Sequence, residues 1–173
     1  MNQVTVSRTS ESLRITAVDL KNGSISKIWL ELLDHYARDP MGGGVGLSDY
    51  AKKHLVERLK TLPSFHGALA FVGDEAVGLI NCFAGFSTFA AKPLLNIHDV
   101  VVRQDRRRQG IAQVLLEWAE GRAGQLGCCK LTLEVLANNL GAMASYSRAG
   151  YAPYVLDPAV GHALLMQKNL LEP

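Results

Sequence analysis

The sequence lacks the features that mark several large classes of protein. It contains only three cysteines, Cys82, Cys128 and Cys129, and their odd number and their spacing fit neither a disulfide framework nor a metal site. We therefore expect reduced, structural thiols and no bound metal. Residues 1–8 are polar and lack the apolar core of a signal peptide, and no apolar run approaches membrane-spanning length. The expected location is the cytoplasm, with no membrane partner.

Charge of one sign is also not in excess. The 18 lysines and arginines nearly balance the 16 aspartates and glutamates, so the formal net charge is +2, and nothing global favours nucleic acid as a partner. The Gly-x-Gly-x-x-Gly pattern of dinucleotide-binding folds and the Gly-Lys-Ser/Thr of phosphate-binding P-loops are absent, as are internal repeats. At 173 residues the chain has the length of one domain, which we expect to span residues 1–173.

What is present is centred on residues 94–125. An apolar segment, 94–102, is typical of a buried strand, and it leads through a turn with four arginines, 103–109, to Gly110 and an amphipathic helix. Free amides and the positive end of a helix dipole converge at such a junction. The junction therefore predicts an anion-binding site, and Gly110 would let the ligand approach the backbone.

The remaining periodicities predict a mixed α/β chain. A first strand covers residues 13–18, and two helices follow, one beginning near Ser24 or Ser26 and ending near Arg38, the other running from Ser48 or Asp49 to Lys60. The later expected elements are a hairpin of residues 65–72 and 76–87, a strand at 131–135 parallel to 94–102, a helix capped by Asn138 or Asn139, and two final strands at 151–155 and 162–167.

The glycine-rich segment 41–46 separates the first two helices. It is either a mobile loop over a substrate or a plain linker. The side chains that could line a substrate on this side of the chain are Asp34, Tyr36, Asp39, Tyr50, Phe86 and Phe89.

Two motifs resemble those of the Gcn5-related N-acetyltransferases. The first is Arg107-Arg108-Gln109-Gly110-Ile111-Ala112, which is similar to the Arg/Gln-x-x-Gly-x-Gly/Ala loop that grips the pyrophosphate of acetyl-CoA in that family. The order of the expected elements is also that of the family. The resemblance implies an α/β fold with a central mixed sheet and helices on both faces, and acetyl-CoA as acetyl donor.

The second motif is Asn139-x-x-Ala142-x-x-x-Tyr146, followed by Ala149-Gly150-Tyr151. It is similar to the family segment in which the asparagine holds the pantetheine arm and the tyrosine is the general acid for the departing thiolate. The resemblance thus implies that Asn139, Ala142 and Tyr146 contact acetyl-CoA, together with the strand residues Val100, Val101 and Val102.

Within the family, the chain resembles the diamine branch of spermidine/spermine and thialysine acetyltransferases. The similar segments are Phe86-Ser87-Thr88-Phe89, Lys92-Pro93 and Ile97-His98-Asp99-Val100-x-Val102. His98 departs from the branch, which carries glutamate at that position, and this weakens the implication of a polycationic acceptor. The branch forms homodimers, so the resemblance also implies a homodimer.

His98 and Asp99 are the candidates for amine chemistry. An alkylamine must lose a proton before it attacks a thioester, and a histidine, with a reference pKa near ~6.5, is suited to take that proton; the alternative is a structural histidine. Asp99 could bind the ammonium or orient His98, but neighbouring strand residues face opposite sides unless a bulge intervenes, as is typical of the family. A backbone amide among Val100–Val102 could stabilise the developing oxyanion.

These residues predict an N-acetyltransferase that acts on a primary amine of a small molecule, a diamine, polyamine or amino-acid-like amine. One alternative is an acetyltransferase for protein lysines or N-termini. Another is a CoA-binding module without chemistry, which the presence of both Asn139 and Tyr146 disfavours.

Overall fold

The protein is described by a computed structural model that covers residues 12–155, 157, 159 and 163–170. The chain divides into two compact units, residues 1–133 and 134–173. A single domain over residues 1–173 stays a prediction.

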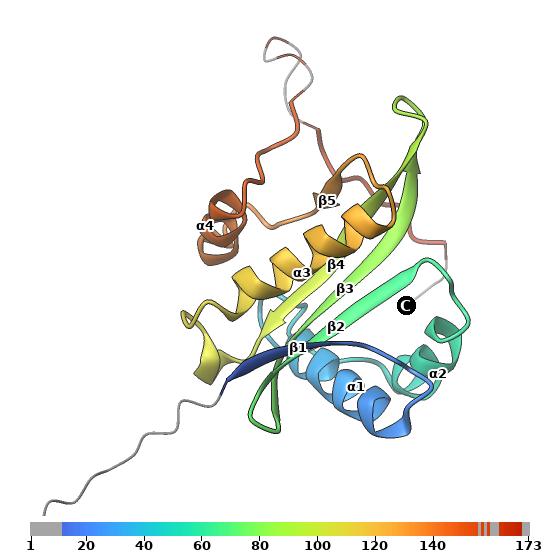
Figure 1. Cartoon of the computed structure of the whole chain (residues 1–173), viewed down its shortest axis with the longest axis vertical. Coiled ribbons are helices and arrows are strands. Elements are labelled where there is room, and N and C mark those ends of the chain that lie inside the picture. Colours follow the sequence, from blue (N-terminus) through green and yellow to red (C-terminus); the bar gives the residue numbers. More distant parts are fainter. Residues whose placement is uncertain (1–11, 156, 158, 160–162, 171–173) are drawn as a thin grey trace, which may run out of the picture. The chain divides into compact units, whose positions relative to one another are not determined.

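The first unit is built on a five-stranded mixed sheet (Figure 1). Its strands follow one another in chain order and are β1 (Leu13–Ala17), β2 (Phe65–Val72), β3 (Glu75–Ser87), β4 (Lys92–Val102) and β5 (Leu131–Leu133). The first four pair antiparallel, while β5 lies parallel to β4 because a helix crosses between them. The predicted hairpin and the predicted parallel strand are confirmed, although β5 ends two residues earlier than expected.

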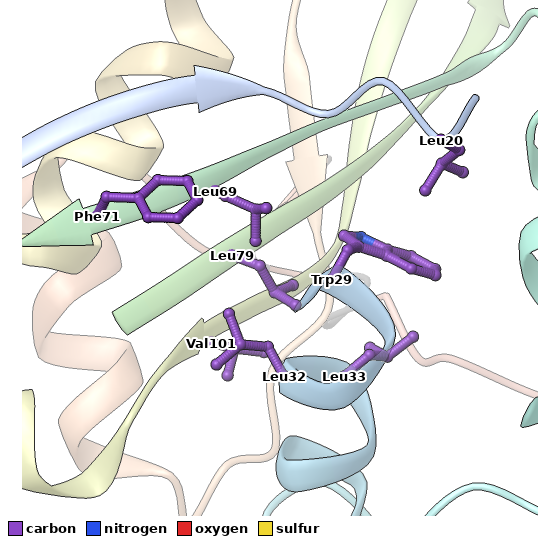
Figure 2. Packing of buried hydrophobic residues seen from close by; sticks show 8 residues of the cluster. All are labelled: Leu20, Trp29, Leu32, Leu33, Leu69, Phe71, Leu79 and Val101. Carbon is purple, nitrogen blue, oxygen red and sulfur yellow. The ribbon is translucent and has the colours of Figure 1, made fainter. Parts of the chain in front are cut away.

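Helices cover both faces of this sheet, as predicted. Helix α1 (Gly23–Ala37) packs Trp29, Leu32 and Leu33 against one face, where the buried cluster includes Leu79 of β3 (Figure 2). Helix α3 (Ile111–Gln125) covers the other face: a Cβ atom on Gly78, the neighbour of Leu79, would lie 3.3 Å from side-chain atoms of α3. Successive strand residues point to opposite faces, so the two helices are separated by the sheet.

The helix starts were predicted with mixed success. Helix α1 begins after Asn22, whose Oδ1 accepts hydrogen bonds from the amides of Ser24 and Ile25 at 3.0 and 3.2 Å. The prediction of Ser24 or Ser26 as the cap is therefore wrong, because Asn22 already satisfies the free amides of the first turn. Helix α2 (Asp49–Leu59) begins after Ser48, as one of the two predicted starts. Tyr50 of this helix, a candidate for the substrate side, is 60% exposed.

The second unit contains helix α4 (Leu140–Arg148), capped by Asn139 and ended by Gly150 at φ +86°. The two predicted final strands are not present: residues 151–155 and 163–167 belong to no strand. Leu164, Leu165 and Met166 are more than three-quarters exposed, so the apolar pattern there has no partner strand among the described residues. His162 lies outside the described residues.

In the part of the chain that the structure describes, no helix combines the length and the apolar character needed to cross a membrane.

Candidate active site

The junction between β4 and α3 presents a row of unpaired backbone amides. The first hydrogen bond of α3 runs from the amide of Val114 to the carbonyl of Gly110 at 3.2 Å, so the amides of residues 111–113 precede it, and no side chain caps the helix. The amides of residues 108–110 donate to no acceptor in the described parts of the chain. Six consecutive donors at a helix N-terminus form a site suited to a phosphate group.

The backbone at this junction is left-handed at two positions. Gly110 has φ +81° and Arg108 has φ +62°. A Cβ atom on Gly110 would meet no heavy atom within 4 Å, so its φ angle, and not crowding by the protein, favours a glycine here. At Gly110, the space beside the backbone is therefore free of protein atoms.

The arginines of the junction differ in their partners. Arg103 and Arg106 both form ion pairs with Glu75 at the start of β3, and Arg103 also pairs with Asp105 at 2.9 Å. Arg107 pairs with Asp39 at 2.6 Å, while the exposed Arg108 forms no ion pair with any described residue. Of the arginines predicted to bind the pyrophosphate, Arg108 is thus the one whose charge is available, and Arg107 would have to share or leave Asp39.

The glycine-rich segment 41–46 folds back onto the end of α1. The carbonyl of Asp39 accepts from the amides of Gly42 and Gly44 at 2.8 and 3.1 Å, and its carboxylate accepts from the amide of Met41 at 2.9 Å. A Cβ atom on Gly42 would lie 2.1 Å from the carbonyl oxygen of Tyr36, so only glycine fits. The hydrogen bond from Arg107 lowers the pKa of Asp39, and Asp39 joins this loop to the basic turn.

Asp34 closes the other end of the same loop. Its carboxylate accepts from the amide of Leu47 at 2.8 Å and pairs with Arg38 at 2.9 Å and with Lys52 at 3.3 Å. The hydrogen bonds from Leu47 and Arg38 lower the pKa of Asp34 to about 2. Asp34 and Asp39, both predicted as candidates for the substrate side, are therefore held in structural contacts in this unit.

A β-bulge in β4 places His98 and Asp99 on one face of the sheet. Asp99 lies opposite Asn81 of β3, whereas Ile97 lies opposite Cys82, so His98 is the additional residue. The His98 ring packs edge-on against Phe83 at 4.7 Å between centroids. Phe83 and Asn81 are two residues apart and share a face, which is the face covered by α1. The bulge implied by the resemblance is present.

Asp99 is half-buried, and its carboxylate is hydrogen-bonded on the side that faces the core. Its Oδ2 accepts from Nδ2 of Asn81 at 2.9 Å, and Oδ1 of Asn81 accepts from the indole Nε1 of Trp29 at 2.8 Å. Burial raises the pKa of Asp99, and the Asn81 hydrogen bond and the positive charge of His98 oppose that rise. Trp29 and Asn81 were not predicted as site residues, although a lone asparagine between apolar residues of a strand was a signal.

The edge of β4 next to β5 is open beyond Ile97. The pairing with β5 covers only Leu95, Asn96 and Ile97, so residues 98–102 face no strand on that side within the described chain. Backbone groups alternate between the two edges of a strand, and some amides or carbonyls of Val100–Val102 therefore point to the open edge. Arg107 uses one of them, because its Nε donates to the carbonyl of Val102 at 3.2 Å.

The second unit holds the other motif residues. Oδ1 of Asn139 accepts from the amide of Ala142 at 3.2 Å and so caps α4. Tyr146 is half-buried, and its ring lies edge-on to Tyr151 at 6.0 Å between centroids. These contacts fix the local positions of Asn139 and Tyr146; their roles toward a ligand stay predictions.

Comparison with known proteins gives a family and a fold. Residues 29–151 match the model of the acetyltransferase (GNAT) family. The thialysine N-epsilon-acetyltransferase of Caenorhabditis elegans is 31% identical over 86 residues, which are 50% of this chain and 53% of that protein. The streptothricin acetyltransferase of Streptomyces lavendulae is 37% identical over 90 residues, or 52% of this chain and 48% of that protein. The chain thus spans about half the length of these curated relatives.

A solved aminoglycoside N-acetyltransferase in complex with CoA has a similar fold. The two structures align with a TM-score of 0.74 at 13% sequence identity, over 94% of this chain and 99% of that chain. At this identity the likeness concerns the fold alone.

Proposed function

The chain belongs to the acetyltransferase (GNAT) family, and on this premise we propose that it is an enzyme that transfers an acetyl group from acetyl-CoA to a primary amine of a small molecule. The observation that carries the proposal is the row of six unpaired amides before and within the first turn of α3, with the unpaired Arg108 beside it. This arrangement fits the two phosphates of a pyrophosphate, which need several donors and positive charge.

The residues present fit acetyl-CoA in the following way. The amides of residues 108–113 and the side chain of Arg108 would hold the pyrophosphate, with Arg107, Gln109, Ile111 and Ala112 as the further motif positions. Val100–Val102 in the first unit, and Asn139 and Ala142 in the second, are the further residues proposed to contact acetyl-CoA. When bound, acetyl-CoA supplies the acetyl group as an activated thioester.

Side chains of the protein would then transfer the protons and stabilise the charges of the reaction. His98 takes the proton that the ammonium must lose, and Asp99 binds the ammonium beforehand. As the acetyl group passes to the amine nitrogen, Tyr146 would give its hydroxyl proton to the departing sulfur. A free amide of Val100–Val102 stabilises the negative charge that develops on the acetyl oxygen.

The acceptor is proposed as a diamine, polyamine or amino-acid-like amine. Two relatives support this class, since their names state that they act on thialysine and on streptothricin. A half-buried carboxylate beside an exposed imidazole also fits a cationic amine. A homodimer and a cytoplasmic location remain part of the same proposal.

Thiol release from acetyl-CoA tests the function. The acceptors to compare are thialysine, spermidine, streptothricin, an aminoglycoside, a lysine-containing peptide and a peptide with a free N-terminus. We expect thialysine or a diamine to accelerate thiol release, with the acetylated amine identified by mass spectrometry. Acceleration by the peptides alone would replace the small-molecule acceptor with a protein. Binding of acetyl-CoA without thiol release for any amine would leave only a CoA-binding module.

A further inference from the structure

We infer that Asn81, locked in orientation by Trp29, is a positioning residue that holds the Asp99 carboxylate ready for a cationic amine. The inference rests on the proposed acetyltransferase function. It adds two residues, one from α1 and one from β3, to the site on β4.

The three side chains form a continuous hydrogen-bonded chain that leads out of the core. Trp29 is fully buried and Asn81 is 2% exposed, while Asp99 is half-buried. The distances are 2.8 Å from the indole nitrogen to Asn81 and 2.9 Å from Asn81 to Asp99. Asn81 is the one polar residue among the buried residues that the structure describes. A buried amide costs stability unless both of its ends are bonded, and here both ends are.

The indole decides which way the amide of Asn81 faces. An indole N–H can only donate, so the atom of Asn81 that meets Trp29 must be the oxygen. The amide nitrogen must then face Asp99, because a flip of the side chain would bring two donors together at Trp29 and two acceptors together at Asp99. Asn81 therefore always presents a donor to Oδ2 of Asp99, which favours the ionised carboxylate.

The second oxygen of Asp99 is left for another partner. No described residue donates a hydrogen bond to Oδ1. Among the described residues that are not exposed, however, every fully buried side-chain oxygen or nitrogen has a hydrogen-bond partner. Oδ1 therefore retains accessible surface, on the face of the sheet that also carries His98. A carboxylate fixed through one oxygen and open through the other suits the binding of an ammonium.

The titratable groups around Asp99 leave its negative charge available to a cation. Burial and the charge of Asp99 raise the pKa of Tyr36 on α1, and they raise the pKa of Cys82 on β3 to about 12. Both groups are therefore neutral at pH 7 and supply no charge. On β4, His98 is the titratable neighbour that can carry a positive charge. When the His98 ring is neutral, no described side chain supplies a positive charge to Asp99, and a cationic amine can take that place.

NMR of the free protein tests this arrangement without any activity. The side-chain carboxyl carbon of Asp99, assigned by its loss in Asp99→Asn, reports the pKa of the carboxyl. In Asn81→Ala we expect that pKa to rise by about one pH unit, because a hydrogen bond to the ionised form is removed. Trp29→Phe should raise it by less, and the double variant should match Asn81→Ala, since Trp29 acts through Asn81. In the wild-type protein, the amide protons of Asn81 should shift with the same titration, which keeps the test valid if a variant does not fold.

Asn96→Ala is the matched control. Asn96 lies on β4 and donates its side-chain amide to Thr132 at 2.9 Å, so its loss removes a comparable hydrogen bond that does not involve Asp99. An unchanged pKa of Asp99 in Asn81→Ala, or an equal rise in Asn96→Ala, would overturn the inference. So would wild-type amide protons of Asn81 that do not follow the titration.

A kinetic measurement with thialysine connects the arrangement to turnover. In Asn81→Ala we expect the KM for thialysine to rise, the acid limb of the kcat/KM profile to move to higher pH, and acetyl-CoA affinity to stay unchanged. A wild-type protein that acetylates no amine would refute the proposed function, while the NMR titration would still decide the role of Asn81. An active wild type whose thialysine KM and pH profile are unaffected in Asn81→Ala would overturn the inference alone.

Discussion

His98 and Asp99 are consecutive residues that lie on the same side of the sheet because the strand is bulged at His98. Their environments differ: His98 is exposed and touches Phe83, whereas Asp99 is half-buried and hydrogen-bonded to Asn81. An exposed imidazole exchanges protons with water readily, and a shielded carboxylate attracts a cation strongly. These different environments support the proposed roles, with His98 as the base and Asp99 as the residue that binds the ammonium.

Tyr146 is the residue for which substitution by phenylalanine gives the clearest answer. A tyrosine hydroxyl has a reference pKa near ~10 and stays protonated at neutral pH. If it protonates the leaving thiolate, Tyr146→Phe should lower kcat by roughly 10²- to 10⁴-fold, with acetyl-CoA affinity nearly preserved. Steady-state kinetics, calorimetry and a thermal melt on one preparation measure the three quantities.

Tyr151→Phe provides the control for that experiment. Tyr151 lies edge-on to Tyr146 in the same unit, so its variant removes a neighbouring hydroxyl and keeps the ring. We expect kcat of Tyr151→Phe to stay near that of the parent. A kcat of Tyr146→Phe within about threefold of the parent, far below the general-acid range, would show that Tyr146 is not an essential acid.

At this scale the sequence revealed residues but not their contacts. His98 and Asp99 stood out through the resemblance to the diamine branch and the acid–base chemistry of their side chains, and Tyr146 stood out through its motif. The bulge follows from how β4 pairs with β3, and a one-residue shift in register is a property of two strands together. For the same reason, the bond between Trp29 and Asn81, 52 positions apart, could not be predicted from local patterns.

Helix α3 has glycines with positive φ angles at both ends, which allows a matched pair of variants. Gly110 has φ +81° and Gly127 has φ +68°, and a Cβ atom would meet no heavy atom within 4 Å at either position. Alanine at either site should therefore cost a similar stability, about 1 kcal/mol. Only Gly110→Ala adds a methyl group beside the free amides, so only this variant should bind acetyl-CoA more weakly, by about tenfold.

Calorimetry with acetyl-CoA and thermal melts on both variants check this expectation. Gly127→Ala corrects for the strain that alanine brings at a positive φ angle. Equal acetyl-CoA affinities in the two folded variants would refute the assignment of the pyrophosphate to the start of α3.

At the scale of elements, local signals were sufficient where one segment determines its own structure. The apolar periodicity of α3 and the two apolar arms of the 65–87 hairpin predicted those elements, and the structure confirms them. The cap of α1 was misassigned because three capping residues, Asn22, Ser24 and Ser26, lie within five positions. The strands predicted at 151–155 and 162–167 are absent from the described residues of those segments, because a strand needs a partner and the partner is not encoded in the segment itself.

The ion pair between Asp39 and Arg107 joins two connecting segments, and the two residues are 68 positions apart in the sequence. Asp39 organises the glycine-rich segment through three amide hydrogen bonds, and Arg107 belongs to the basic turn. An anion bound at the turn would compete with Asp39 for Arg107. The conformation of the glycine-rich segment is thus linked to the charge at the turn, whether the segment covers a substrate or only connects two helices.

At the scale of the whole molecule, the proposed machinery is divided between the two units. The free amides, Arg108, His98 and Asp99 belong to residues 1–133, whereas Asn139 and Tyr146 belong to residues 134–173. Acetyl transfer as proposed needs both sets of residues.

The whole molecule should lose stability in acid for a reason visible in its carboxylates. Hydrogen bonds from basic side chains or backbone amides lower the pKa of Asp34, Asp39, Glu75 and Asp105, whereas burial raises the pKa of Asp99. A group with a lowered pKa stabilises the fold fully above its ordinary pKa, near ~4, and loses that contribution as the pH falls through its folded value. Asp99 has the opposite sign, since its contribution is present below its ordinary pKa and is lost as the pH rises.

Urea unfolding between pH 7 and pH 2 measures the balance. Four groups with lowered pKa values outnumber one with a raised value, so we expect the free energy of unfolding to fall below about pH 5. Asp34→Asn should flatten the fall most at the lowest pH, because the pKa of Asp34 is lowered to about 2. High salt should weaken the effect, since these carboxylates are accessible to solvent. Asp74→Asn, at an exposed turn carboxylate with no ion pair among the described residues, is the control; if Asp34→Asn and Asp74→Asn gave the same pH dependence, the hydrogen bonds and ion pairs of Asp34 would not be a source of acid sensitivity.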